Sequence, residues 1–240
     1  MRESNETPVS RIMSDAQSTP QVSPTGPLPS DRAVSTRKRP KPGERRVQIL
    51  QALATMLEQP GAERITTAAL AARLEVSEAA LYRHFASKAQ MFEGLIEFIE
   101  QTVFSLVNQI VERENASGPA DARPDAGAGT RQACKVVAMV MQFAEKNPGM
   151  ARVMVGDALV FENERLQHRM NQFFDKIEST LKQSLRAVAD LSGSATPSVD
   201  TQVRASVLTA FVVGRLQRFA RSGFKRLPSE HLEASLALIL

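Results

Sequence analysis

Polar residues between Thr66 and Phe85 stand where two short helices would each begin, and where the second would face outward. Thr66 and Ser77 are suited to cap these helices, because a hydroxyl oxygen accepts a backbone N–H that the first turn leaves without a partner. The outward side of the second helix carries groups that hydrogen-bond to bases or phosphates: Ser77, Glu78, Tyr82, Arg83 and His84. The stretch therefore predicts reversible hydrogen bonding to nucleic acid.

Apolar residues predict how these two helices pack. They fall on one side of each helix, with Leu70, Ala71 and Leu74 in the first and Ala80, Leu81 and Phe85 in the second. The small side chain of Ala71 allows a close and steep crossing of the two. Such a pair around a tight turn is a helix-turn-helix, whose second helix reads DNA.

Each polar residue has a DNA-contact interpretation and a structural alternative. The hydroxyl and backbone N–H groups of Thr66 and Thr67 suit a phosphate, although both residues could simply serve as caps. Ala79 is placed to touch a thymine methyl or to permit close approach to the DNA. Tyr82 is interpreted as a phosphate contact rather than a packing residue, and Arg83 as a DNA contact rather than a solvated cation.

The 240 residues carry a net charge of +4, and the length suffices for one large domain or two small ones. Basic residues crowd before the first predicted helix, at Arg37, Lys38, Arg39, Lys41, Arg45 and Arg46. This run suits phosphate contact, since neutralised phosphates release counterions; the alternative is a solvated arm. No apolar run approaches the roughly 20 residues of a membrane span and no signal core is visible, so we expect a cytoplasmic protein without membrane contact.

Catalytic and metal-binding chemistry finds no support in the sequence. Cys134 is the single cysteine, which excludes an intrachain disulfide and a cysteine-rich metal site and favours a buried structural thiol. His84, His168 and His231 lack the spacing of metal ligands. No Gly-rich phosphate loop or nucleophile–base arrangement occurs. We therefore expect a protein that is not an enzyme and binds no metal or cofactor.

Hydrophobic periodicity predicts an all-α fold with a tail, a head and a body, and no strand pattern competes. Residues 1–42, rich in Ser, Thr and Pro, predict a disordered tail. Residues 43–90 form the three-helix DNA-binding head, and residues 91–240 form the body, with a flexible Gly- and Pro-containing loop at 115–130. Helices beyond the helix-turn-helix are expected near 44–59, 87–113, 133–145, 151–161, 163–189 and 199–221, with a short terminal helix after residue 229.

The head resembles that of the TetR-type regulators, whose hallmark Thr-x-x-x-Leu-Ala begins here at Thr66 and ends in Leu81-Tyr82-x-His84-Phe85-x-Ser87-Lys88. Within that group the chain looks like the nucleoid occlusion factors of the SlmA type, from about Glu44 to the C-terminus. The segments that carry this resemblance are 64–68, 76–85, 95–100, 145–149, 161–162 with 165–167, and 221–222 with 224–225.

Two features depart from the family pattern. Glu75 stands in the turn of the helix-turn-helix, where the family usually has Gly. A residue with a Cβ in the left-handed conformation costs on the order of 1 kcal/mol, so we expect a strained or shifted turn. The tail and the loop at 115–130 are also longer than the resemblance leads one to expect.

The resemblance implies a homodimer that binds palindromic double-stranded DNA across the nucleoid. From there it would engage the C-terminal tail of the division protein FtsZ, antagonise FtsZ polymers and keep the septum away from the chromosome. It also implies phosphate contacts for His84 and Lys88, and an FtsZ-tail site with Phe98, Lys146 and Asn147. A cation beside apolar surface suits a short acidic and apolar tail, although Phe98 could equally be a core residue.

Late apolar helix faces predict the dimer contacts, for which we name Phe173, Ile177, Val207, Phe211 and Leu216. Two helices from each subunit would pair into a four-helix core; the alternative is that these residues fill the body of one subunit. A dimer is favoured because one head reads too few base pairs for useful specificity. The alternative function is a TetR-type repressor released from its operator by a small molecule bound in an apolar body pocket.

Overall fold

The computed structural model describes residues 43–59, 65–116, 126–191, 193 and 195–240, and every regular element within these ranges is helical. The predicted all-α fold is confirmed. The helices are α1 (Glu44–Leu57), α2 (Thr67–Arg73), α3 (Glu78–Tyr82), α4 (Lys88–Ala116), α5 (Ala126–Lys146), α6 (Pro148–Met154), α7 (Glu164–Leu191), α8 (Pro197–Arg221) and α9 (Leu232–Ile239), with a 3₁₀ turn η3 (Asp157–Leu159) before α7.

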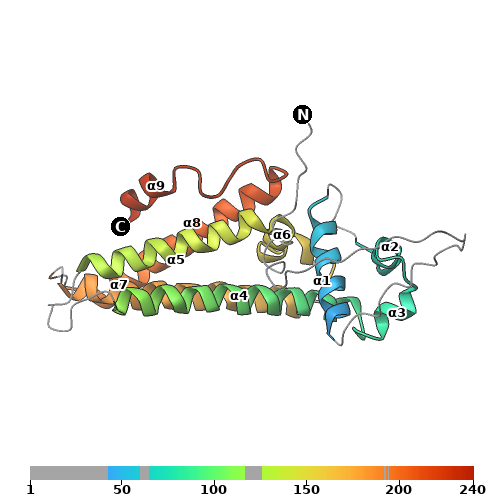
Figure 1. Cartoon of the computed structure of the whole chain (residues 1–240). Coiled ribbons are helices and arrows are strands. Elements are labelled where there is room, and N and C mark those ends of the chain that lie inside the picture. The colour runs from blue at the N-terminus through green and yellow to red at the C-terminus, as the bar shows by residue number, and fades with distance from the viewer. Residues whose placement is uncertain (1–42, 60–64, 117–125, 192, 194) are drawn as a thin grey trace, which may run out of the picture.

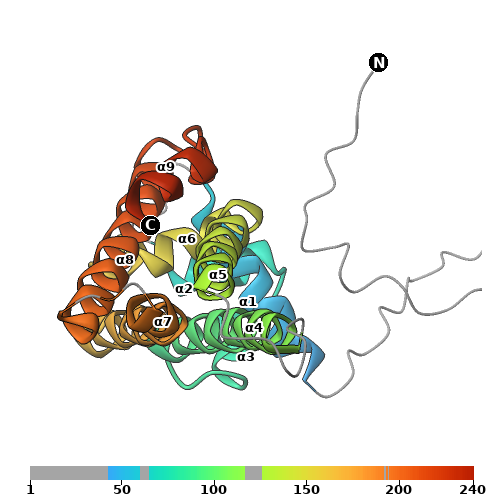
Figure 2. The same ribbon diagram turned by 90° about the vertical axis from the view of Figure 1, so that its left-hand side faces the viewer.

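The head of α1–α3 lies at one end of an elongated body (Figure 1). Helix α4 starts beside the head and runs the length of the body, with α5, α7 and α8 alongside it. Seen along the body, α7 lies between α4 and α8, while α5 covers the side of α4 and α7 (Figure 2). The long helices bury apolar stripes against one another, which makes the body a helical bundle.

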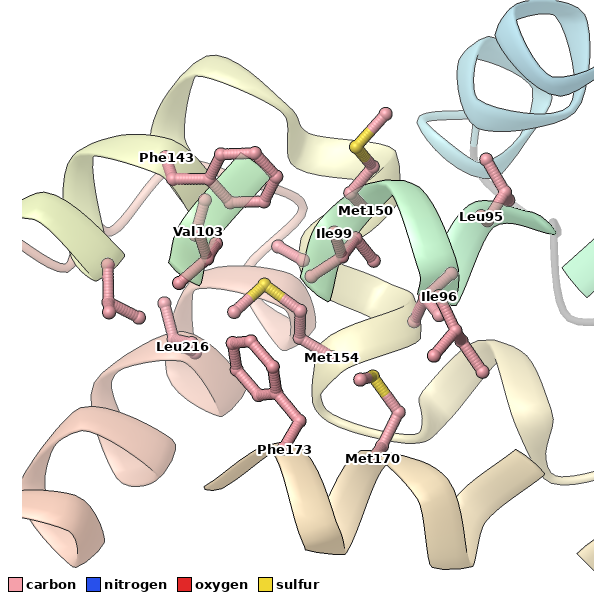
Figure 3. Close-up of a cluster of buried hydrophobic side chains, with 14 of the residues drawn as sticks. Leu95, Ile96, Ile99, Val103, Phe143, Met150, Met154, Met170, Phe173 and Leu216 are labelled. Atoms are coloured by element: carbon pink, nitrogen blue, oxygen red, sulfur yellow. The ribbon is translucent and has the colours of Figure 1, made fainter. Parts of the chain in front are cut away.

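The centre of the body is apolar, and α4 to α8 all contribute to it (Figure 3). Large buried side chains from these helices meet there, among them Ile96, Ile99, Phe143, Met154, Met170, Phe173 and Leu216. Methionines are well suited to such a meeting point, since their unbranched side chains fill irregular gaps between crossing helices.

Helix α6 joins the head to the body. A Cβ on Gly149 would overlap the carbonyl oxygen of Ala54 in α1, so only Gly allows the two backbones to lie this close. Arg152 donates a hydrogen bond to the Gln59 carbonyl (3.2 Å), and its guanidinium lies 5.1 Å from the ring centroid of Phe224. The end of α1 is therefore held by α6 and by the turn after α8.

The same joint contains Glu58, the residue that ends α1. Burial raises the pKa of its carboxyl above 4.5, an effect that the backbone N–H of Gly149 and the positive charge of Arg73 reduce. At neutral pH, the ionised carboxylate of Glu58 therefore destabilises the contact between the head and the body.

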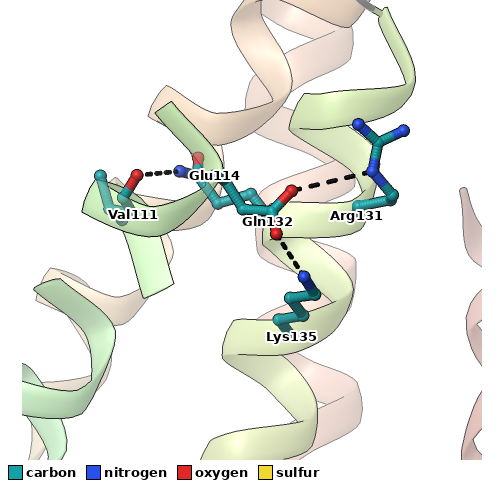
Figure 4. A network of polar contacts seen from close by, with 5 residues as sticks. All are labelled: Val111, Glu114, Arg131, Gln132 and Lys135. Carbon is teal, nitrogen blue, oxygen red and sulfur yellow. Dashed lines mark hydrogen bonds and ion pairs between the residues drawn. The ribbon is translucent and has the colours of Figure 1, made fainter. Parts of the chain in front are cut away.

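At the far end of the body, a polar cluster fastens α4 to α5 (Figure 4). The carboxylate of Glu114 accepts a hydrogen bond from Lys135 and lies 3.7 Å from the Nε of Arg131. The amide of Gln132 donates to the backbone carbonyl of Val111 at 3.5 Å. These contacts fix how α5 lies along α4.

The loop predicted at 115–130 is too long at both ends. Helix α4 continues to Ala116 and α5 begins at Ala126, while residues 117–125 lie outside the described ranges. Gly129 accounts for part of the error, because it was counted among the Gly and Pro residues that suggested a flexible segment. In the structure a Cβ there would overlap the Ser184 carbonyl of α7, so Gly129 serves a close helix–helix contact.

The helix predicted at 151–161 is also wrong in its extent. Helix α6 begins at Pro148 and ends at Met154; Gly156 then takes a left-handed φ of +81° and η3 follows. Gly just beyond the end of a helix is a common stop signal, and the prediction overlooked it. The helix predicted at 133–145 exists but begins seven residues earlier, at Ala126, and the remaining predicted helices are confirmed with small shifts at their ends.

Three further expectations concern the chain as a whole. The tail at 1–42, with Arg37, Lys38, Arg39 and Lys41, lies outside the described residues. Cys134 is half-buried in α5, and burial raises the pKa of its thiol, which keeps the thiol protonated at neutral pH. In the described part of the chain, no helix combines the length and apolarity needed to cross a membrane.

Candidate nucleic-acid interface

The two short helices of the head begin at the predicted caps. Thr66 Oγ1 accepts the backbone N–H of Ala69 at 3.1 Å, and Ser77 Oγ accepts that of Ala80 at 3.3 Å. Each hydroxyl thus satisfies one backbone donor of a first turn. Because both bonds lie inside the head, they fix where α2 and α3 start.

The turn between α2 and α3 confirms the expected left-handed residue. Glu75 has a φ of +54°, and its N–H donates to the Ala72 carbonyl at 3.1 Å. The N–H of Val76 donates to the Ala71 carbonyl at 3.0 Å. These two bonds make a Schellman motif, in which Glu75 occupies the position that Gly prefers. The turn is therefore regular in its hydrogen bonds and strained at one residue.

Helix α3 lies at the outer end of the head (Figure 1). Leu81 and Phe85 are buried behind it. The residues predicted to read DNA are accessible: Ser77, Glu78, Ala79, Tyr82 and Arg83 are exposed, as is Thr66 of the preceding cap, while His84 and Thr67 are half-buried. This accessible face is the candidate DNA interface.

Thr67, Glu78 and Tyr82 contact one another across the two helices. The Thr67 hydroxyl donates to Oε2 of Glu78 at 2.6 Å, and the Tyr82 hydroxyl lies 3.5 Å from Oγ1 of Thr67. The sequence did not predict this contact, since the residues belong to different helices. Thr67 therefore has its hydroxyl hydrogen engaged with Glu78, and its backbone N–H is the group left for a phosphate.

Arg46 of α1 holds the end of α3. Its guanidinium donates to the His84 carbonyl at 2.7 Å and lies 4.3 Å from the centroid of the Phe85 ring. The sequence placed Arg46 in a basic run suited to phosphates. In the structure its charge stabilises the C-terminal end of α3, where backbone carbonyls favour a cation.

Lys88 begins α4 and pairs with the body. Its ammonium lies 2.5 Å from the carboxylate of Glu162. Two further ion pairs continue along α4 and α7, Glu93 with Arg165 and Glu100 with Arg169. The Glu100 carboxylate also raises the pKa of Arg169 by accepting its hydrogen bonds. These pairs fix α7 against the helix that leaves the head.

The predicted FtsZ-tail residues lie on α4 and at the end of α5, two helices that pack together. Phe98 is 40% exposed and Lys146 is exposed. Asn147 is half-buried, and its side-chain amide donates to the Phe143 carbonyl at 2.8 Å. Phe98 is therefore not a core residue, whereas Asn147 has a structural contact of its own.

Two further exposed residues lie at helical spacing from these positions. Leu106 follows Phe98 by eight residues and is 37% exposed, so both lie on one face of α4. Gln142 precedes Lys146 by four residues and is likewise exposed on α5. Helical spacing from Phe98 and Lys146 would have found both.

The predicted dimer residues fall into two groups. Phe173, Ile177 and Leu216 are completely buried within one subunit, so their assignment as dimer contacts is wrong. Phe211 is half-buried beneath the guanidinium of Arg215. Val207 is 46% exposed on α8. The helical spacing of these apolar residues predicted that they share a face of α7 or α8. It could not show whether that face lies inside the subunit or on its surface.

Helix α8 carries exposed apolar residues at helical spacing. Val199, Val203 and Val207 recur every fourth residue and are 58%, 55% and 46% exposed. Residues four apart lie above one another, so the three valines form a stripe along α8. This valine stripe is the largest run of regularly spaced exposed apolar residues on α8.

Family models match both parts of the chain. A model described as bacterial regulatory proteins of the tetR family matches residues 49–95. A model described as a tetracyclin repressor-like C-terminal domain, of the SlmA-like type, matches residues 130–240.

Solved structures share the fold at low sequence identity. The regulator FadR from Bacillus subtilis, solved with stearoyl-CoA, superposes with a TM-score of 0.60 at 14% identity over 80% of this chain and 96% of its own. The TetR-family regulator PfmR from Thermus thermophilus gives a TM-score of 0.60 at 20% identity over 80% of this chain and 97% of its own. These likenesses establish the TetR-type fold.

Curated relatives are much closer in sequence. The nucleoid occlusion factor SlmA of Idiomarina loihiensis is 48% identical over 191 residues, which are 79% of this chain and 90% of the relative. The SlmA of Vibrio cholerae is 47% identical over 196 residues, 81% of this chain and 93% of the relative. Both alignments are too long to rest on the head alone. The chain therefore belongs to the SlmA family of nucleoid occlusion factors, within the TetR-type regulators.

Proposed function

We propose that this protein is a nucleoid occlusion factor. As a homodimer bound to palindromic chromosomal sites, it engages the C-terminal tail of FtsZ and antagonises FtsZ polymers, so that no septum forms over the nucleoid. The observation that carries the proposal is identity of 47–48% to nucleoid occlusion factors over the body as well as the head. It acts as a regulator without catalytic chemistry, in the cytoplasm and on the nucleoid.

The accessible face of α3 is the proposed DNA-reading surface, and the division of labour follows from its geometry. Ser77, Glu78 and Ala79 open α3, and the N-terminal residues of such a helix meet base edges in the major groove. Tyr82 and Arg83 lie one turn later and reach the sugar–phosphate backbone. Residues 43–90 thus act as the DNA-binding domain.

The valine stripe of α8 is the proposed dimer surface. A subunit that leaves three valines exposed at helical spacing gains free energy by burying them against the same stripe of a second copy. The two heads then read the two halves of a palindrome. Residues 91–240 act as the dimerisation and partner-binding domain.

The surface of Phe98, Leu106, Gln142 and Lys146 is the proposed FtsZ-tail site. Phe98 and Leu106 offer an apolar strip along α4. Lys146 is exposed at the end of α5, the helix that packs against α4. An extended tail with apolar and acidic residues would bury the first group and pair with the second.

Binding of a fluorescent FtsZ C-terminal peptide, with and without a duplex carrying a family-type palindrome, tests the proposal. We expect saturable binding that Lys146→Glu abolishes while the thermal melt is unchanged. Lys176→Glu is the matched control, because it makes the same charge reversal on another helix, α7. The ammonium of Lys176 lies 5.8 Å from the centroid of the Phe104 ring. Tight DNA binding without any peptide binding would instead favour a ligand-released repressor.

A further inference from the structure

Glu78 is an acidic residue at the start of the reading helix, where negative charge faces DNA. It is the first residue of α3 and is exposed. Phosphates repel a carboxylate, so a carboxylate on this face weakens binding unless it meets a hydrogen-bond donor. In the major groove the donors are amino groups on base edges.

The carboxylate of Glu78 is held from one side only. Oε2 accepts the Thr67 hydroxyl at 2.6 Å. Among the residues that the structure describes, Oε1 has no hydrogen-bond partner. Thr67 has a single hydroxyl hydrogen, which goes to Glu78, so the Tyr82 hydroxyl at 3.5 Å is the donor toward Thr67 Oγ1. One oxygen is thereby anchored, and the other remains available as an acceptor.

Anchoring matters because a free Glu side chain loses rotamer freedom when it meets a base. Thr67 lies in the first turn of α2, capped by Thr66, and Glu78 lies in the first turn of α3, capped by Ser77. The hydrogen bond therefore joins two fixed points of the helix-turn-helix. The carboxylate is pre-organised before DNA arrives, which lowers the entropy cost of a base contact.

We propose that Glu78 is a specificity-determining residue that accepts a hydrogen bond from the N4 amino group of one cytosine in each half-site. Thr67 is the positioning residue that holds the carboxylate for this contact. Cytosine N4 and adenine N6 are both amino donors in the major groove, but adenine N6 stands beside the acceptor N7, which repels a carboxylate. Cytosine is therefore the base that suits Glu or Asp. This inference rests on the proposed DNA-binding function, and it assigns a base preference to a single position.

Selection of bound duplexes from a library randomised in both half-sites tests the inference, with the full chain as the protein. For the unsubstituted protein we expect one position per half-site at which cytosine is preferred by roughly 5- to 150-fold, the range of a good base contact. Glu78→Ala should lower that preference to about twofold or less and leave other positions unchanged. Glu78→Gln should shift it toward adenine, since a Gln amide pairs with the adenine edge.

Three variants separate base reading from charge and folding. Glu75→Gln removes a carboxylate from the nearby turn and should leave the cytosine preference intact. Thr67→Val keeps Glu78 but removes the hydroxyl that anchors it, so the cytosine preference should fall partway at the same position. Thr67→Ser keeps a hydroxyl at this position and should therefore retain the full cytosine preference. These Thr67 variants keep the test valid if Glu78→Ala fails to fold.

The outcomes are distinguishable. Sequence selection that keeps the cytosine preference in Glu78→Ala, or that contains no cytosine-specific position, overturns the role of Glu78 while leaving DNA binding in place. If Glu78→Ala loses base preference at every position of the site, Glu78 contributes to the stability of the head instead of reading one base. If the unsubstituted protein selects no sequence at all, the proposed function is overturned, and with it this inference.

Discussion

The ammonium of Lys88 lies 2.5 Å from the carboxylate of Glu162, so the cation that begins α4 is paired within its own chain. The family resemblance assigns Lys88 to a DNA phosphate. The carboxylate and the phosphate are alternative partners for one ammonium, and the side chains of Lys88 and Glu162 are 30% and 10% exposed. A phosphate contact by Lys88 would therefore couple DNA binding to the docking of the η3–α7 connection on α4.

Glu162→Gln should release Lys88 and strengthen DNA binding several-fold. The logarithm of affinity against that of salt concentration should steepen by about 0.9 for each phosphate that Lys88 newly neutralises. Titration of a labelled palindromic duplex over a salt series measures both. Glu164→Gln is the control, because it removes an equal charge from the exposed start of α7. Equal slopes in all three proteins would mean that Lys88 does not contact DNA.

Arg83→Ala should weaken DNA binding by about 1–3 kcal/mol if Arg83 makes a specific contact. Arg83 is exposed at the end of α3. Affinity for the palindrome is measured beside Arg218→Ala, which removes the same charge from an exposed site on α8. Unchanged affinity across the salt series would remove Arg83 from the interface.

Val203→Asp should convert the dimer to a monomer. Val203 is the middle residue of the valine stripe, and two carboxylates brought together in a dry interface would each lose their hydration. Sedimentation equilibrium measures the mass, and Asn108→Asp on the exposed face of α4 is the control. A Val203→Asp protein that stays dimeric would move the interface away from α8.

Local signals in the sequence were sufficient for the head. Thr66 and Ser77 are the N-caps that the sequence predicted for α2 and α3. Glu75 has the left-handed conformation expected for its position in the turn. Each of these features depends on residues within one turn. The same is true of most helix ends in the body.

Contacts between distant segments could not be predicted in this way. Phe173 and Val203 are both apolar at helical spacing, yet one is buried within the subunit and the other is exposed. The difference depends on which helices cover α7 and α8, and that is a property of the packed body. The pairing of Lys88 with Glu162 likewise joins residues far apart in the chain.

Glu58 should make stability depend on pH. Its pKa in the folded protein lies above the ordinary 4.5, because burial disfavours the charged form. The stabilising contribution of the protonated carboxyl is complete below the unfolded pKa and is lost as pH rises through the folded value. Urea unfolding should therefore show Glu58→Gln to be more stable than the unsubstituted protein at pH 7, with the difference vanishing near pH 4.5. Glu112→Gln, exposed on α4, should show no such trend.

Gly149→Ala should destabilise the protein by about 1–3 kcal/mol, since the new methyl group would overlap the Ala54 carbonyl and push α1 away from α6. Chemical denaturation measures the loss. Gly129→Ala is the matched comparison, because it creates an equivalent overlap with Ser184 at the far end of the body. If α6 positions the head, Gly149→Ala should lower DNA affinity more than Gly129→Ala at the same loss of stability. Equal effects on DNA affinity would mean that the α1–α6 contact stabilises the fold without orienting the head.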